Sequence, residues 1–459
     1  MTRAIAHWGR ADIDTDAYGH YIVARRALDA PLDLSVHWVW LPGWHVVHGL
    51  FDLSGLGFEA IRAFSLGCSL ATVALLFWWV EREARELVSS LDTHNQDTPA
   101  PFATVAATVA ALSLAVARPA IDAGGSGEPE ALFSLLVLGA VASLRIDRPA
   151  LAGALAAAAA LTRYEAWPFV GALFVIERLD ARSSARRAPR RALAWVLPAI
   201  AIGLWCVAHR IHSGEWLAFI RENRAFVART LPRLHAALPP WPRRALQYPV
   251  IVPWASWGVI PIGLCAIGAV IAAKRRQASL FVAPALLLGF LTYSWVRGQH
   301  LGLVRHAVAY LPFYAAAIGV GAASALRVAR SSRVAQGAGG AALGLILCAR
   351  GVEGAREHRA SAEHALVDER RAAEVLRAEA GDRSQIFCDV AAVEVFSRAH
   401  RSRFIRWNGA DIRPYNLTVA VEQRGGAWVV SRPERVRALL ASSVVRYESP
   451  RLVVLRANR

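Results

Sequence analysis

Acidic residues gather near the amino terminus in a pattern that suits catalysis or ligand binding. Asp12, Asp14 and Asp16 stand at alternate positions of DIDTDAY, directly ahead of an apolar-periodic segment. Carboxylates this close repel one another, so they favour a divalent cation, a shared proton or a substrate hydroxyl. The alternative is a solvated loop in which Asp16 caps a helix. These three aspartates form the first candidate site, and the choice among the ligands stays open.

Two further charged motifs interrupt apolar sequence. Glu128 ends the Gly-rich stretch DAGGSGE and is followed by Pro129. A carboxylate there is also explained by the positive end of a helix macrodipole. Arg163 and Glu165 lie in TRYE, between two short apolar segments, and a salt bridge between them is the structural alternative. We take these charged side chains as candidate substrate-binding residues.

A third motif, RGQHLGLVRH, precedes the apolar segment AVAYLPFYAAAI and contains Arg297, His300 and Arg305. An arginine at the mouth of a membrane helix suits phosphate, because its planar fork donates charge-assisted hydrogen bonds. Snorkelling to lipid headgroups is the alternative. His45 and His48 are spaced to share a metal, but the usual third and fourth ligands are not evident. Packing or contact with lipid headgroups is therefore favoured for them, and the metal ligands stay unassigned.

Composition indicates a membrane protein. Of 459 residues, 55% are hydrophobic and only 19% are charged, below the roughly 25% typical of soluble proteins. The formal charge of +17 does not indicate nucleic-acid binding, because arginines collect at the ends of apolar segments. The five cysteines show no pattern of a disulfide framework.

The apolar segments predict an α-helical polytopic membrane protein with about ten membrane helices, some of them short or re-entrant. The fourth and fifth segments are short, and one continuous helix of 28 residues is the alternative to two passes. The expected spans are residues 60–80, 102–117, 130–144, 150–162, 166–177, 192–208, 250–273, 279–296, 306–326 and 334–349.

Charge predicts the orientation, because short cytoplasmic loops are rich in arginine and lysine. With the short pair counted as two passes, the Arg-rich loops share one side, which we assign to the cytoplasm. The candidate sites then share the extracytoplasmic side. Segment 209–249 also falls there despite its arginines, and its interleaved aromatic residues indicate contact with lipid headgroups or a substrate role.

The last part of the chain is more polar and alternates helical and strand-like patterns. We expect a first extracytoplasmic acidic loop with an interfacial segment at 1–59, a transmembrane domain at 60–350 and a small extracytoplasmic α/β domain at 351–459.

The order of these motifs resembles the polytopic glycosyltransferases of the C superfamily, which include protein mannosyltransferases and lipid A aminoarabinose transferases. The resemblance covers most of the membrane part, although only eleven residues precede Asp12 and the acidic motif is Asp-x-Asp-x-Asp rather than Asp-Glu. The matching stretches are DIDTDAYGHYIVARRAL with LPGWHVVHGL, then SGEPEALFSLLVLG, LAGALAAAAALTRYEAWPF and RHAVAYLPF.

The resemblance implies transfer of a sugar from a polyprenyl-phosphate donor to an acceptor hydroxyl on the extracytoplasmic face. It makes Asp16, with Asp14, the expected general base, and Arg305 a candidate for the lipid phosphate. Asp12, Glu128 and the remaining charged candidates would bind substrate, and a divalent cation among the three aspartates remains an option for a cofactor.

The expected partners are the lipid-linked donor, membrane lipids and an acceptor that is a glycolipid, glycan or protein, with no nucleic acid. The expected location is the bacterial plasma (inner) membrane. The main alternative function is a transporter or flippase for a lipid-linked or anionic substrate, which should carry ionisable residues within its spans. A membrane scaffold acting through residues 350–459 is the third.

Overall fold

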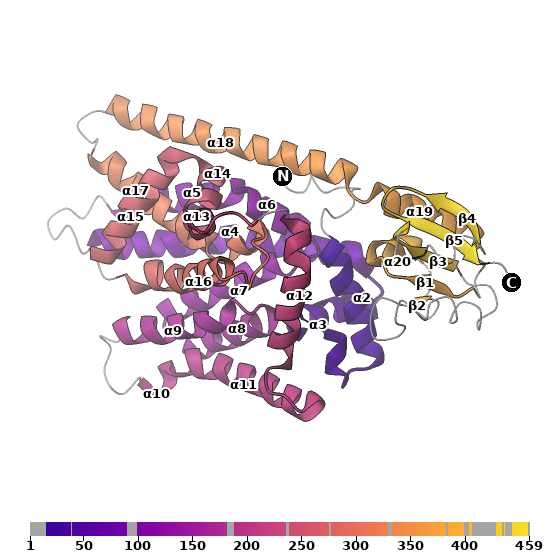
Figure 1. Ribbon diagram of the computed structural model, residues 1–459. Helices are drawn as coiled ribbons and strands as arrows, with labels where there is room; N and C mark the ends of the chain where they lie inside the picture. The colour runs from indigo at the N-terminus through magenta and orange to yellow at the C-terminus, as the bar shows by residue number, and fades with distance from the viewer. Residues whose placement is uncertain are drawn as a thin grey trace. The chain divides into compact units, whose positions relative to one another are not determined.

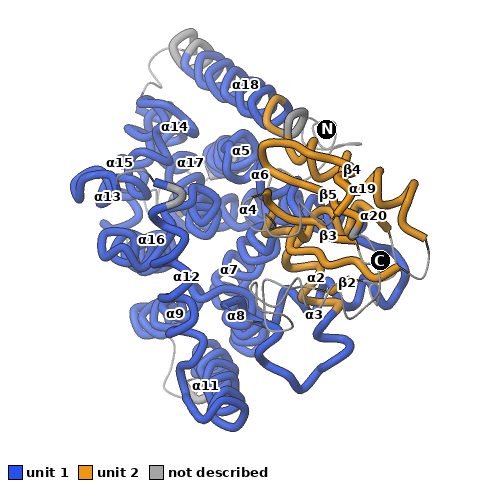
Figure 2. Tube along the Cα trace, turned by 45° about the vertical axis from the view of Figure 1, so that its right-hand side comes forward, with its two compact units in different colours: residues 1–8, 26–359 blue, residues 9–25, 360–459 orange. Residues whose placement is uncertain are grey.

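The computed structural model describes most of the chain, and its described residues form two compact units (Figures 1 and 2). Of the described residues, those within 26–359 form one unit, and those within 15–25 and 360–457 form the other. The expected three-part division concerns sides of a membrane and stays a prediction. The described residues are 15–37, 39–89, 99–180, 188–235, 238–274, 277–328, 333–381, 384–398, 404–405, 428–433, 436 and 443–457.

The first unit is built from helices. Two helices, α2 (Thr15–Asp29) and α18 (Arg333–His364), pass from one unit into the other. The remaining elements of the first unit are η1 (Leu34–His37), α3 (Pro42–Leu53), α4 (Gly57–Ser89), α5 (Pro99–Val116), α6 (Arg118–Gly125), α7 (Glu130–Arg145), α8 (Pro149–Thr162), α9 (Ala166–Asp180), α10 (Ala188–Arg191), α11 (Leu193–Ser213), α12 (Ala218–Leu234), α13 (Trp241–Leu246), the π-helical η3 (Gln247–Ile251), α14 (Val252–Trp257), α15 (Val259–Lys274), α16 (Ala278–Val296), η4 (Val304–Ala309) and α17 (Leu311–Val328).

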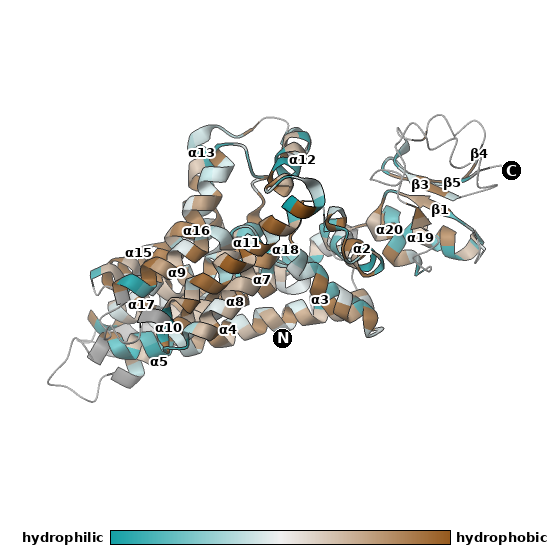
Figure 3. Ribbon diagram, turned by 90° about the horizontal axis from the view of Figure 1, so that it is seen from below, coloured by the Kyte–Doolittle hydropathy of each residue, from teal (hydrophilic) through white to brown (hydrophobic). Residues whose placement is uncertain are grey.

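Each of the ten expected spans contains a helix, and the predicted polytopic helical fold is confirmed. Within the described residues, α4, α11, α16 and α17 are long and apolar enough to cross a membrane alone. A fifth span arises if α5 and α6, which meet at a bend of 64°, are counted as one. Helices α8 and α15 are apolar but shorter. Figure 3 shows apolar colouring along α11 and α16, as membrane contact requires.

Two breaks in apolar sequence shape the first unit. Helices α8 and α9 are separate, and residues 163–165 connect them, so the single long helix considered from the sequence does not form. The expected span 250–273 is wrong as one helix, because the chain breaks between α14 and α15. Gly258 has φ +81° there, a conformation that favours glycine.

Small residues let several helices of the first unit approach closely. Helix α17 packs against α5 and α15, and α8 packs against α7 and α11. A Cβ atom on Gly268 of α15 would collide with the Ala317 backbone oxygen of α17, and one on Gly321 would collide with the Leu264 oxygen. Because these backbones touch, only glycine fits at the crossing of α15 with α17.

We predict that Gly268→Ala destabilises the protein by about 1–3 kcal/mol or more, because the added methyl group meets backbone rather than a movable side chain. Gly263→Ala is the matched control on the same helix, since a Cβ there meets no atom within 4 Å. Thermal unfolding in detergent should show a lower Tm only for Gly268→Ala. Equal Tm values for the two variants would contradict this description of the crossing.

The second unit contains the small α/β domain expected at the carboxyl end. Its sheet has the strand order β2-β1-β3-β5-β4. Strand β1 is parallel to β2 and β3, whereas β5 is antiparallel to β3 and β4. Tyr18 of α2 packs edge-on against Phe396 of α20, so α2 contributes to this unit. The elements are α19 (Val367–Glu379), β1 (Ile386–Cys388), α20 (Ala391–Ser397), β2 (Phe404–Ile405), β3 (Trp428–Ser431), β4 (Ser443–Glu448) and β5 (Val453–Ala457).

Candidate active site

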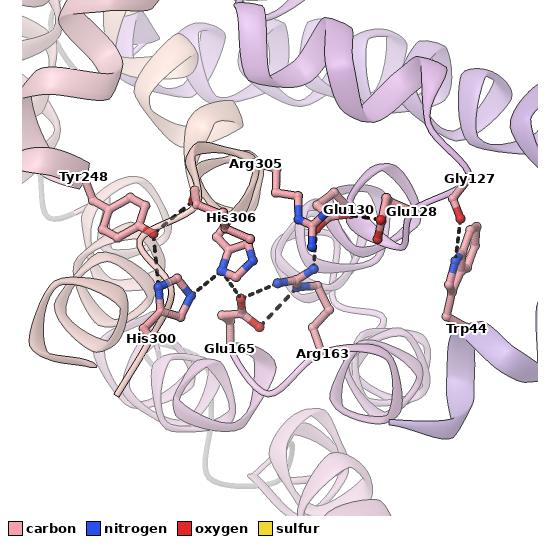
Figure 4. Close-up of polar contacts among 11 residues, drawn as sticks. Trp44, Gly127, Glu128, Glu130, Arg163, Glu165, Tyr248, His300, Arg305 and His306 are labelled. Atoms are coloured by element: carbon pink, nitrogen blue, oxygen red, sulfur yellow. Dashed lines mark hydrogen bonds and ion pairs between the residues drawn. The ribbon is translucent and has the colours of Figure 1, made fainter. Parts of the chain in front are cut away.

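The charged candidates of the first unit meet where helices begin, end or break (Figure 4). Glu128 and Glu130 flank Pro129 at the start of α7. Arg163 and Glu165 lie in the break between α8 and α9. A third group comes from the loop and the 3-10 helix η4 that connect α16 to α17, and Tyr248 comes from η3. Segments far apart in the sequence therefore supply one polar cluster.

An alternating chain of carboxylates and guanidinium groups forms the centre of the cluster. Arg305 Nη1 lies 3.1 Å from Glu128 Oε1, and Arg305 Nε lies 3.4 Å from Glu130 Oε1. Arg163 Nη1 donates to the same Glu130 oxygen at 2.5 Å. Arg163 also makes a two-point contact with Glu165, at 2.7 and 3.2 Å. Such two-point pairing fixes the plane of the guanidinium group.

Two histidines extend the chain beyond Glu165. His306 Nδ1 lies 3.5 Å from Glu165 Oε1 and contacts His300 Nε2. The Gly302 N–H donates to His300 Nδ1 at 3.1 Å, and the Tyr248 hydroxyl lies 3.2 Å from the same nitrogen. The backbone donor places the His300 proton on Nε2, from which it reaches His306.

Because these side chains are buried, their charges strongly affect one another's pKa values. Side-chain exposure is 3% for Glu128, 2% for Glu130 and 7% for Glu165. Burial alone would raise the pKa of Glu165, but the Arg163 guanidinium outweighs it and holds that pKa below its usual value. Burial lowers the pKa of His300 to about 4, against the opposing pull of Glu165. Near neutral pH, His300 is therefore uncharged and Glu165 is ionised.

Helices α3 and α4 anchor the Gly-rich loop that carries Glu128. The buried Trp44 indole donates to Gly127 O at 2.9 Å, and His48 Nε2 lies 3.2 Å from the same oxygen. Arg62 Nε donates to Gly125 O at 3.2 Å. Glu128 is therefore positioned by anchoring of the loop backbone as well as by its ion pair, and the contact of Trp44 with Gly127 can be followed in Figure 4.

The structure brings together five of the residues selected from the sequence, namely Glu128, Arg163, Glu165, His300 and Arg305. The salt bridge considered between Arg163 and Glu165 is present, and it belongs to the larger chain of charges. The residues come from three separate motifs, and the fold brings them into one connected network of contacts.

The other selected residues are placed differently. Arg297 is exposed at the end of α16 and, among the described residues, its side chain contacts no member of the cluster. Asp16 is half-buried in the first turn of α2, within the second unit. Asp12 and Asp14 lie outside the described residues, so the cation expected among the three aspartates stays a prediction.

Sequence reasoning did not select Glu130, His306 and Tyr248. Glu130 and His306 stand within two residues of selected charges, and that proximity was the available signal. Tyr248 belongs to segment 209–249, whose interleaved aromatic residues indicated headgroup contact or a substrate role, but no local pattern singled it out. Glu130 is the central member, because one of its oxygens accepts from Arg163 and faces Arg305. Its other oxygen, Oε2, is buried and makes no hydrogen bond to the described part of the chain.

The described residues include one group whose donor set suits a metal ion, formed by Glu165, His300 and His306. The sequence suggested that His45 and His48 could share a metal ion, but each of them contacts a different residue. His45 Nδ1 lies 2.7 Å from His37 Nδ1, whereas His48 contacts the Gly-rich loop. A packing role for these two residues accounts for both contacts.

The fold of this chain is similar to that of a protein whose crystal structure is known. No family model matches the sequence, and no curated protein matches it. The structure is similar to the crystal structure of ArnT from Cupriavidus metallidurans bound to undecaprenyl phosphate, with a TM-score of 0.64 and 13% identity. That alignment covers 99% of this chain and 96% of ArnT. The chain has the ArnT fold.

The apo crystal structure of the same ArnT gives a TM-score of 0.62 at 14% identity, with 99% of this chain and 95% of that chain covered. These two similarities confirm the polytopic helical fold with a small carboxyl-terminal sheet that the sequence resemblance implied. The apolar helices and this fold together make the chain a membrane protein.

We predict that Glu130→Gln destabilises the protein by about 3 kcal/mol, because it removes the buried negative charge that compensates the largely covered Arg163 and Arg305. Glu353→Gln is the matched control, since Glu353 forms an exposed pair with Arg350 and should change stability by about 1 kcal/mol at most. Unfolding of both variants in detergent tests the difference. A Glu130→Gln protein as stable as the control would show that the pairing contributes nothing to stability.

Proposed function

We propose that the protein is a membrane glycosyltransferase that moves a sugar from a polyprenyl-phosphate-linked donor to an acceptor hydroxyl on the extracytoplasmic face. The observation that carries this proposal is the pair Arg163 and Arg305, held in a buried carboxylate cluster within an ArnT fold. The solved ArnT is bound to undecaprenyl phosphate, and a guanidinium pair is suited to the phosphate of such a lipid.

The carboxylates supply the complementary part of the proposed site. Glu128 and Glu130 neutralise part of the charge of the two arginines, so a bound phosphate would compete with these carboxylates for the guanidinium groups. Glu130 Oε2 has no partner among the described residues and is suited to accept a hydrogen bond from a sugar hydroxyl. This arrangement favours a donor that carries both an anionic and a hydroxyl-rich part.

The proposed reaction is direct displacement at the anomeric carbon. The acceptor oxygen forms a bond to that carbon while the bond from carbon to the phosphate oxygen breaks, and the electron pair leaves with the lipid phosphate. Asp16, together with Asp14, takes the proton of the acceptor hydroxyl as general base. Arg305 and Arg163 stabilise the charge on the departing phosphate, which needs compensation more than protonation.

We expect Asp14→Asn with Asp16→Asn to lower the rate of donor consumption by about 100-fold or more, because the base is removed. The assay presents proteoliposomes with a panel of polyprenyl-phosphate sugars and candidate acceptors, and mass spectrometry follows the donor. Consumption of one donor by the wild type would identify its sugar. An unchanged rate in the double variant would remove Asp14 and Asp16 from the mechanism.

Arg305→Gln should lower donor turnover by about 100-fold, because a charge-stabilising donor to the leaving group is lost. Arg82→Gln is the control, as Arg82 forms an exposed pair with Glu86 and should leave turnover unchanged. The same proteoliposomes distinguish the transporter alternative. Movement of a labelled lipid-linked sugar across the bilayer, with no donor consumed, would replace the transferase proposal with a flippase.

A further inference from the structure

Beyond Glu165, the cluster ends in His300 and His306. These two histidines and the Glu165 carboxylate together offer ligand atoms for a metal ion, a feature that ion pairing does not explain. Glu165, His300 and His306 each offer one ligand atom, and these three atoms lie within 4.8 Å of one another. Two imidazoles and one carboxylate are the protein ligands of many catalytic zinc sites, which keep a fourth position open. The three residues come from two segments about 135 positions apart, so the fold brings them together.

The facing ring nitrogens of His300 and His306 are a second observation that indicates a bound cation. His300 Nε2 and His306 Nδ1 point at one another, and Glu165 Oε1 lies 3.5 Å from that His306 nitrogen. Two ring nitrogens in this position require either a shared proton or a shared metal ion between them. The nearby carboxylate oxygen supplies the negative charge that a cation needs and that a neutral proton bridge does not.

We propose that Glu165, His300 and His306 form a binding site for one divalent transition-metal ion of the zinc type. Neutral imidazole and carboxylate suit such an ion better than they suit magnesium or calcium. The site is separate from the Asp12, Asp14 and Asp16 motif. It requires no catalytic activity of the protein, although the use of its open position by a phosphate oxygen would rest on the proposed function.

Neighbouring groups orient the ligands and also limit the affinity. When His300 Nε2 binds the ion, the ring proton moves to Nδ1, where the Tyr248 oxygen at 3.2 Å can accept it. The Gly302 N–H, which donates to that Nδ1 in the metal-free chain, then loses its acceptor. Arg163 occupies part of the Glu165 carboxylate and repels the cation. We therefore expect weaker binding than at structural zinc sites, which lack these costs.

The test uses the full chain in detergent, without a polyhistidine tag and after removal of metal by chelator. Zn²⁺ binding is measured by equilibrium dialysis with elemental analysis, and Co²⁺ binding by the visible bands of a tetrahedral site. We expect one ion per chain in the wild type. His300→Gln and His306→Gln should each weaken that binding by at least about 10–100-fold.

His212→Gln is the matched control, because His212 lies near the Asp33 carboxylate on a more exposed surface, with 35% of its side chain accessible. It should bind the ion as the wild type does. Glu165→Gln provides a third ligand variant, and size-exclusion profiles establish that each variant is folded. The wild-type Co²⁺ spectrum is informative even if every ligand variant misfolds.

Two results would overturn the metal site. The first is a wild-type chain that takes up no stoichiometric Zn²⁺ or Co²⁺. The second is a folded His300→Gln or His306→Gln protein with unchanged affinity and spectrum, which would place the bound ion elsewhere. Neither result depends on donor turnover, so failure of the metal site and failure of the transferase proposal are distinguishable.

Discussion

Pairing of buried charge is the constraint on which the first unit depends. Glu128, Glu130 and Glu165 are almost wholly buried, and an uncompensated carboxylate in that environment costs several kcal/mol. Arg163 and Arg305 supply the compensation from other segments of the chain. Because the partners stand at three separate helix breaks, their pairing determines where those breaks meet. The helices end where these charged side chains pair, and the apolar segments between the pairs pack against one another.

Much of the fold could be predicted because charged residues are rare in the apolar part of the chain. Every expected span contains a helix, although span 250–273 is divided between α14 and α15. The fourth and fifth segments, counted as two passes in the orientation, are the separate helices α8 and α9. The break at Gly258 was not predicted, since no charge interrupts the apolar sequence there and glycine is common in membrane helices. The bend between α5 and α6 falls at Arg118 and Pro119, where the expected span 102–117 ends, but the helical continuation α6 was not predicted.

The same reasoning found part of the site and missed the rest for a physical reason. A charge at the end of an apolar segment is conspicuous, so Glu128, Arg163 and Arg305 could be selected from the sequence. Which charge pairs with which depends on helix packing between segments up to 177 positions apart, and no local pattern encodes that. The Tyr248 hydroxyl meets His300 and the Leu303 carbonyl oxygen only in the folded chain, so no local pattern distinguished this residue from the other aromatic residues of segment 209–249.

The glycine crossing of α15 with α17 has a consequence for lipids. Since the backbones touch at Gly268 and Gly321, no methylene chain fits between these two helices at that point. A second contact of this type joins Gly319 of α17 to the Ala106 backbone of α5. The long isoprenoid tail of the proposed donor is as bulky as an acyl chain, so both seams are closed to it. A lipid-linked sugar that binds the arginine pair would therefore not place its tail between α17 and either of these two helices.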